Sequence, residues 1–342
     1  MKRLSDFFRT GRRRWIVFIL VALLAIGGGS LVYLDEQHRF DIRTESFTFE
    51  SGDDTLAATL HLPTGDGPHG IVVFVPGDGT ADSDPGTLPV WEALAEAGYA
   101  TVKWDKPGVR KSTGNWLDQD MRDRSDEVID VLNTLAHRGD LDVRNVGLIG
   151  ISQGGWVIPL VAERIDVDFF VAWSTAIDWT EQGQYFTERQ LDDVDPDLAE
   201  RVRQADRSES GNTYQQYSQW HDALDADVQS FFTKMAEDRW RFVIRNQDLD
   251  ARDTLHAMKD MPVLLLLGED DHNVDVDDTE RVYREILDGP CLDVIRYPDA
   301  DHNLLDHDGL GLTATAIFQP RNIFANGMLD DIERFAAAPH DC

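Results

Sequence analysis

Apolar runs of strand length alternate with helical patterns along most of the chain. Residues 70–75 and 99–104 are largely apolar, as expected of strands that are covered on both faces. Between them, residues 91–97 have a helical pattern that ends at Gly98. The remaining predicted elements are strands at 46–50, 55–62, 145–149, 168–173, 261–267 and 292–297, and helices at 123–138, 154–164, 277–287 and 321–337. This alternation predicts an α/β fold, a mostly parallel central sheet flanked by helices.

The alternation breaks between residues 178 and 260. This segment contains no clear buried strand and is polar, charged and rich in aromatic residues. It predicts a helical cap inserted into a core made of residues 46–177 and 261–342. We expect the cap over the carboxyl ends of the strands, where ligands bind in sheets of this kind.

The N-terminus has the pattern of a membrane anchor. Residues 15–34 form an uncharged run of 20 residues, about 30 Å long as a helix. The preceding segment 1–14 carries six basic residues and should stay cytoplasmic. We therefore expect a single-pass cell-membrane protein with an extracytoplasmic catalytic domain, joined to its helix by a tether at 35–45. A cleaved signal peptide or a twin-arginine signal is the alternative, although the run is long and no A-x-A site follows it.

The charge balance is strongly acidic. The chain has 63 Asp and Glu against 32 Lys and Arg, a formal net charge of -31. Such a surface repels nucleic acid, so we expect no nucleic-acid partner. Halophilic adaptation, in which acidic residues keep the protein hydrated at high salt, and an ordinary compositional bias both account for the charge.

Cysteine and metal-binding patterns are sparse. The two cysteines, Cys291 and Cys342, could form one bridge outside the cell or remain unpaired thiols. No CxxC pair or HExxH motif occurs, and two partial matches to a calcium-binding loop lack its glycine and its final glutamate. We expect no metal and no cofactor.

The candidate nucleophile is Ser152, in the pentapeptide Gly150-Ile-Ser-Gln-Gly154. An apolar strand precedes this G-x-S-x-G sequence and an apolar helix follows it. In that setting a serine is held on a strained turn with its hydroxyl exposed. A serine hydroxyl needs a base within hydrogen-bond reach, and the base needs an acid that orients it.

Two later loops offer the acid and the base. Asp271 follows the strand that ends at Leu267, and His302 follows the strand that ends near Tyr297, so Ser152, Asp271 and His302 are the predicted triad. Weaker candidates are also present, namely Asp270, Asp275 and Asp277 for the acid and His272 and His307 for the base.

The chain resembles the α/β-hydrolase superfamily from about residue 46 to 338. The segment 73–79 resembles the family's strand followed by His-Gly-x-Gly, with Pro76 in place of the histidine. The loop 104–112 resembles Asp-x-x-Gly-x-Gly-x-Ser, with Arg110 at the second glycine. The residues around Ser152 are similar to an esterase or peptidase-like subgroup. Gly268-Glu-Asp-Asp271 matches the family's Gly-x-x-Asp acid loop, which favours Asp271 over its neighbours.

The resemblance also implies an oxyanion hole made of two backbone N–H groups. One belongs to Gln153, after the nucleophile, and the other to Asp78, with Gly79 as the alternative. Because a carboxylate would oppose an oxyanion, we expect the Asp78 side chain to point away and to bond its own loop.

These residues predict a serine hydrolase that cleaves esters or related small acyl compounds through an acyl-enzyme on Ser152. A serine peptidase and an acyltransferase are the alternatives, and the intact triad argues against a non-catalytic binding module.

Overall fold

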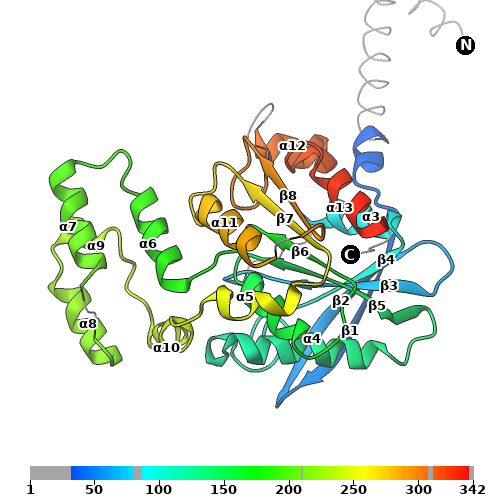
Figure 1. The fold of residues 1–342 in the computed structure, drawn as a ribbon, viewed down its shortest axis with the longest axis horizontal. Helices are drawn as coiled ribbons and strands as arrows, with labels where there is room; N and C mark the ends of the chain where they lie inside the picture. The colour runs from blue at the N-terminus through cyan, green and yellow to red at the C-terminus, as the bar shows by residue number, and fades with distance from the viewer. Residues whose placement is uncertain (1–31, 81–85, 209–210, 288, 307–310, 339–342) are drawn as a thin grey trace, which may run out of the picture.

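The computed structural model describes residues 32–80, 86–208, 211–287, 289–306 and 311–338. Its centre is an eight-stranded sheet of order β1-β2-β4-β3-β5-β6-β7-β8 (Figure 1). The strands are β1 (Ile42–Ser51), β2 (Asp54–Pro63), β3 (His69–Val75), β4 (Tyr99–Trp104), β5 (Leu141–Ile151), β6 (Phe169–Trp173), β7 (Val263–Gly268) and β8 (Leu292–Tyr297). Strand β2 is antiparallel to β1 and β4, and every other neighbouring pair is parallel. The predicted α/β fold is thus confirmed.

Helices cover both faces of the sheet. One face carries α4 (Met121–Leu135), α5 (Gly154–Ala162) and α11 (Val276–Ile286), and the other carries α3 (Leu88–Glu96) and α13 (Met328–Ala337). Strand β3 shows why its sequence is continuously apolar. Ile71, Val73 and Val75 belong to the first core, whereas Val72 and Phe74 belong to the second. Successive side chains of a strand point to opposite faces, and both faces are covered here.

The segment before the sheet differs from the predicted tether. Residues 32–37 are helical, and β1 begins at Ile42, before the predicted start at Ser46. Arg321 donates to the backbone carbonyls of Gln37 and Arg39 and pairs with Glu92 of α3. The segment is therefore packed against the domain. The strand predicted at 46–50 is present, but its first four residues were missed because β1 is an edge strand with many exposed side chains, which weakens the apolar pattern.

The predicted membrane span at 15–34 lies almost wholly outside the described residues. Within the described part of the chain, no helix is long and apolar enough to cross a membrane.

The insertion after β6 is helical. It contains α6 (Trp179–Arg189), α7 (Pro196–Asp206), α8 (Tyr214–Ala223), α9 (Ala226–Gln229) and α10 (Glu237–Asn246). Helices α7, α8 and α9 lie far from the sheet and have a small core of their own, whereas α10 lies nearer the sheet (Figure 1). Asp178 and Asp250 form a β-bridge that brings the two ends of the insertion together.

The C-terminal region differs from the single predicted helix at 321–337. A short helix α12 (Leu312–Phe318) and a 3₁₀ turn (Pro320–Asn322) come first, and α13 begins only at Met328. Gly327 has a φ of 84°, a left-handed conformation that interrupts the helical backbone. Cys291, directly before β8, is disulfide-bonded, and the one other cysteine of the sequence, Cys342, lies outside the described residues.

Candidate active site

Ser152 stands on a sharp turn between β5 and α5. Its φ is 53°, a left-handed conformation that is strained for a residue with a side chain. Its N–H donates to the carbonyl oxygen of Trp173, at the end of β6, over 3.0 Å. The turn brings backbones close together. A Cβ atom on Gly150 would lie 2.7 Å from the carbonyl oxygen of Gly154, and one on Gly154 would lie 2.4 Å from that of Val75. Glycine at both positions is therefore required to hold the serine here.

Asp271 and His302 are brought together by the loops after β7 and β8. His302 Nδ1 lies 2.8 Å from Asp271 Oδ2, and the Asp271 side chain is 0% exposed. The other carboxylate oxygen accepts the backbone N–H groups of Asn273 and Val274. A proton on Nδ1 shared with the carboxylate leaves the lone pair of Nε2 available as a base.

The alternative acids and bases have other surroundings. Asp270 and His272 are exposed and contact each other over 3.2 Å. Asp275 caps the N-terminus of α11, and Asp277 pairs with Arg296. His307 lies outside the described residues. Among the described candidates, Asp271 and His302 are the two that combine burial with a direct hydrogen bond.

The loop after β3 passes directly beside Ser152. A Cβ atom on Gly77 would lie 2.9 Å from Ser152 Cβ and 3.5 Å from its Oγ. The two predicted oxyanion donors on this loop, Asp78 and Gly79, are thus next to a glycine that contacts the serine. Gln153, the third predicted donor, follows Ser152 and has a buried side chain.

Two buried cations hold the carbonyl groups of this loop. Lys106 Nζ donates to the carbonyl oxygens of Gly77 over 2.5 Å and Gly79 over 2.9 Å. Arg124 donates to the carbonyl oxygen of Pro76 and to the Gln153 side chain. Neither cation was among the predicted site residues. A lysine directly after a buried strand and an arginine on the apolar face of a helix were the available indications.

Burial shifts the ionisation of these groups. It lowers the pKa of Lys106 well below its usual value and also lowers the pKa of Arg124. It raises the pKa of Glu127, whose carboxylate accepts from Trp104 and Gln119. The loop after β3 therefore rests on a charged network that is shielded from water.

The Asp78 side chain was expected to bond mainly to its own loop. Its main contact is instead with the helical insertion. It forms a two-pronged ion pair with Arg239 of α10, with both distances 2.7 Å. Burial raises the pKa of Asp78. The net effect is nevertheless a lowered pKa, because the hydrogen bonds and charge of Arg239, the charge of Lys106 and the N–H of Gly79 all stabilise the carboxylate. Arg239 also lies over the rings of Trp116 and Phe242. The contact was unpredictable because its partners are 161 residues apart.

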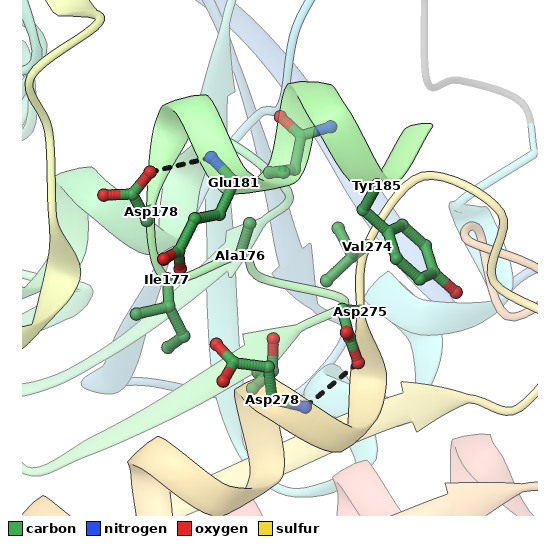
Figure 2. Close-up of a pocket in the computed structure, with 10 residues that line it drawn as sticks. Ala176, Ile177, Asp178, Glu181, Tyr185, Val274, Asp275 and Asp278 are labelled. Atoms are coloured by element: carbon green, nitrogen blue, oxygen red, sulfur yellow. Dashed lines mark hydrogen bonds between the residues drawn. The ribbon is translucent and has the colours of Figure 1, made fainter. Parts of the chain in front are cut away.

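An acidic cavity of about 280 Å³ lies between α6 and α11 (Figure 2). Its lining includes four carboxylates, which belong to Asp178, Glu181, Asp275 and Asp278. On the same helix α6, Tyr185 donates to the backbone oxygen of Asp271 over 3.1 Å. The cavity thus adjoins the loop of the predicted acid. Within the described part of the chain, no group of three or more His, Cys, Asp or Glu side chains could hold a metal ion.

Residues 51–295, more than half of the chain, match the model of a known family, described as X-Pro dipeptidyl-peptidase (S15 family). The chain belongs to the S15 family. Its members are hydrolases of the α/β-hydrolase superfamily, and this S15-family chain is therefore a hydrolase with the fold that its motifs predicted. Among curated proteins, no sequence matches it.

Solved structures support the fold. The esterase Pf2001 of Pyrococcus furiosus is 16% identical, with a TM-score of 0.53, over 76% of this chain and 84% of that one. Est1E of Butyrivibrio proteoclasticus, solved with ferulic acid bound, is 17% identical, with a TM-score of 0.53, over 85% and 96%. A hypothetical protein of Pseudomonas aeruginosa is 17% identical, with a TM-score of 0.55, over 87% and 94%. At these identities the likeness establishes the fold of this S15-family chain and nothing finer.

The turn that holds Ser152 should not tolerate a methyl group at Gly154. We expect Gly154→Ala to destabilise the protein by about 1–3 kcal/mol, because the new Cβ would overlap the backbone of β3. Gly183→Ala is the matched control, because a Cβ there meets nothing within 4 Å. It removes a glycine from the interior of α6 and should stabilise the protein by about 0.5–1 kcal/mol. Thermal unfolding of both variants checks this, and equal midpoints would contradict it.

The ion pair between Asp78 and Arg239 should matter for hydrolysis. Arg239→Met leaves a carboxylate beside the predicted oxyanion hole without its main counter-charge, so we expect hydrolytic kcat/KM to fall about tenfold, or about 1.4 kcal/mol. Adding Asp78→Asn should restore most of the loss, because the opposing charge is then gone. Arg241→Met is the control, since Arg241 pairs within α10 with Glu237. A double variant as impaired as Arg239→Met would refute the electrostatic explanation.

Proposed function

We propose that this chain is a serine hydrolase that cleaves carboxylic esters or related acyl compounds through an acyl-enzyme on Ser152. The observation that carries the proposal is the strained turn at Ser152, beside Gly77, at the same edge of the sheet as the hydrogen-bonded pair of Asp271 and His302. The proposed nucleophile, acid and base follow β5, β7 and β8 respectively, in the chain order expected of this fold.

The reaction has two halves. His302 Nε2 takes the proton of the Ser152 hydroxyl while Oγ bonds to the substrate's carbonyl carbon. The N–H groups of Gln153 and Asp78 receive the oxyanion. The intermediate collapses, the bond to the leaving group breaks, and His302 returns the proton to that group. Water then attacks the acyl-enzyme by the same steps and releases the acid, while Asp271 holds the imidazole in its tautomer.

Ester cleavage is the first candidate because two of the solved structures with this fold are named esterases. A peptidase that takes a substrate with a free amino group is the second. The family model is named for X-Pro dipeptidyl-peptidase, and the acidic cavity beside the Asp271 loop would attract an ammonium group. Both candidates use the same nucleophile and differ in the leaving group and in what the cavity binds.

The nucleophile can be tested with a fluorophosphonate probe. We expect the wild-type chain to be labelled and Ser152→Ala to remain unlabelled while it unfolds at a similar temperature. Asp271→Asn should slow labelling strongly, by up to about 10⁴-fold, because the imidazole loses its orienting carboxylate. Ser230→Ala, a change at an exposed serine of the cap, serves as the control. Persistent labelling of Ser152→Ala would remove the assignment.

A substrate panel separates the two candidates. It compares p-nitrophenyl esters of short acids with Gly-Pro-p-nitroanilide and with its N-acetylated form. Esterase function predicts a kcat/KM for the esters at least 100-fold above that for the anilides. A preference for the free-amino anilide over the acetylated one, lost in Glu181→Gln, would instead favour the peptidase.

We further propose that the catalytic domain lies outside the cell, anchored by residues 15–34. The disulfide bond of Cys291 supports an oxidising compartment, and the basic residues at 1–14 support an inward-facing N-terminus. A protease added to cells with a permeable outer layer and an intact membrane should remove the domain and spare a cytoplasmic marker. A domain that resists until the membrane is lysed would contradict this orientation.

A further inference from the structure

We propose that Lys106 is a positioning residue of the oxyanion hole, which orients the peptide whose N–H belongs to Asp78. This inference rests on the proposed serine-hydrolase function and deepens it. Lys106 comes from the loop after β4, far from the predicted triad in sequence, and its ammonium group lies beneath the loop that borders Ser152.

The hydrogen bonds of Lys106 fix the direction of the peptide planes. In a trans peptide the C=O and N–H bonds point in opposite directions. Nζ holds the carbonyl of Gly77, so the N–H of Asp78 in the same peptide faces away from the lysine. The carbonyl of Gly79 is held in the same way. Gly77 lies against Ser152. The oriented N–H belongs to Asp78, the next residue of the loop, and is therefore close to the proposed nucleophile.

The alternative donor is less suited to the role. The carboxylate of Asp78 interacts with the backbone N–H of Gly79, which contributes to the lowered pKa of Asp78. That N–H therefore has a carboxylate beside it, which would oppose a developing oxyanion. The Asp78 N–H is the donor whose peptide is anchored on its carbonyl side by a cation.

The burial of Lys106 is hard to explain by stability alone. The residue is 5% exposed, and its ammonium contacts two carbonyls and the ring face of Trp116 at 4.4 Å. Burying a charge is expensive, and replacing buried charges by apolar side chains of similar size is often neutral or stabilising. A methionine would fit the same space, whereas it could not hold two carbonyl oxygens. Compared with an apolar side chain, the lysine therefore provides the two hydrogen bonds that hold the loop.

Lys106 also places a positive charge directly behind the loop. The charged groups that act on it are Arg124 and Glu127 of α4, Asp78 of the loop and Arg239 of the cap. A positive charge behind the Asp78 peptide favours the negative charge that develops on the substrate oxygen. The lysine should therefore contribute in its ammonium form, below its pKa.

The test compares Lys106→Met with Lys111→Met in the full-length chain, kept in mild detergent. Lys111 is an exposed lysine five positions away. With p-nitrophenyl acetate, we expect Lys106→Met to lower kcat roughly 100-fold with KM changed less than threefold, since misplacement of a catalytic group costs about that much. Its unfolding temperature should stay equal to or above that of the wild type. Lys111→Met should match the wild type in every measurement.

A pH profile keeps the inference testable if Lys106→Met does not fold. Burial lowers the pKa of Lys106, so the wild type should lose kcat on the alkaline side at a pH below the usual range of lysine. Lys106→Arg keeps a cation that does not titrate there, so its kcat should persist to higher pH. Identical alkaline limbs in the two proteins would overturn the inference, as would an unchanged kcat in Lys106→Met.

The two proposals fail in different ways. A wild-type chain that the fluorophosphonate probe does not label at Ser152 refutes the serine-hydrolase function. A wild-type chain that is labelled, with Lys106→Met labelled at the same rate, refutes only the role of Lys106.

Discussion

The backbone contact between the turn after β5 and strand β3 is the constraint on which the rest of the site depends. Gly154 approaches the carbonyl of Val75, and Gly77, two residues further along the same chain segment, lies against Ser152. These backbone contacts place Ser152, the proposed nucleophile, beside the loop of the proposed oxyanion donors. Strain of this kind persists where the surrounding structure holds the backbone in place, and the close approaches at Gly150 and Gly154 do so on either side of Ser152.

A set of buried charged residues supports the loop after β3 on the side of its carbonyl groups. Lys106 and Arg124 bind its carbonyls, and Glu127 balances their charge from α4. The cap completes the set, because Arg239 of α10 reaches the Asp78 carboxylate. The position of the cap and the charge of the loop are therefore linked through the ion pair of Arg239 and Asp78. Through this ion pair the insertion contacts the loop of the proposed oxyanion donors directly.

Much of this could be predicted from the sequence, and the failures share a cause. The strands β3, β4 and β7 were evident because both faces of each are buried, so their sequences are continuously apolar. The start of β1 was missed because an edge strand carries a weaker pattern. The outward anchor at 15–34 and the advantage of the acidic surface at high salt stay predictions.

The order of elements, the family motifs and the residues that carry the proposed chemistry all follow from local sequence patterns. Ser152, Asp271 and His302 were identified by the strands that each follows, which is local information. The tertiary structure alone decided how Lys106, Arg124 and Arg239 are used. An ionisable side chain has the same sequence pattern on a surface as beneath a loop. Its role depends on which distant carbonyls and carboxylates the fold brings within hydrogen-bond distance, and on how completely it excludes water there.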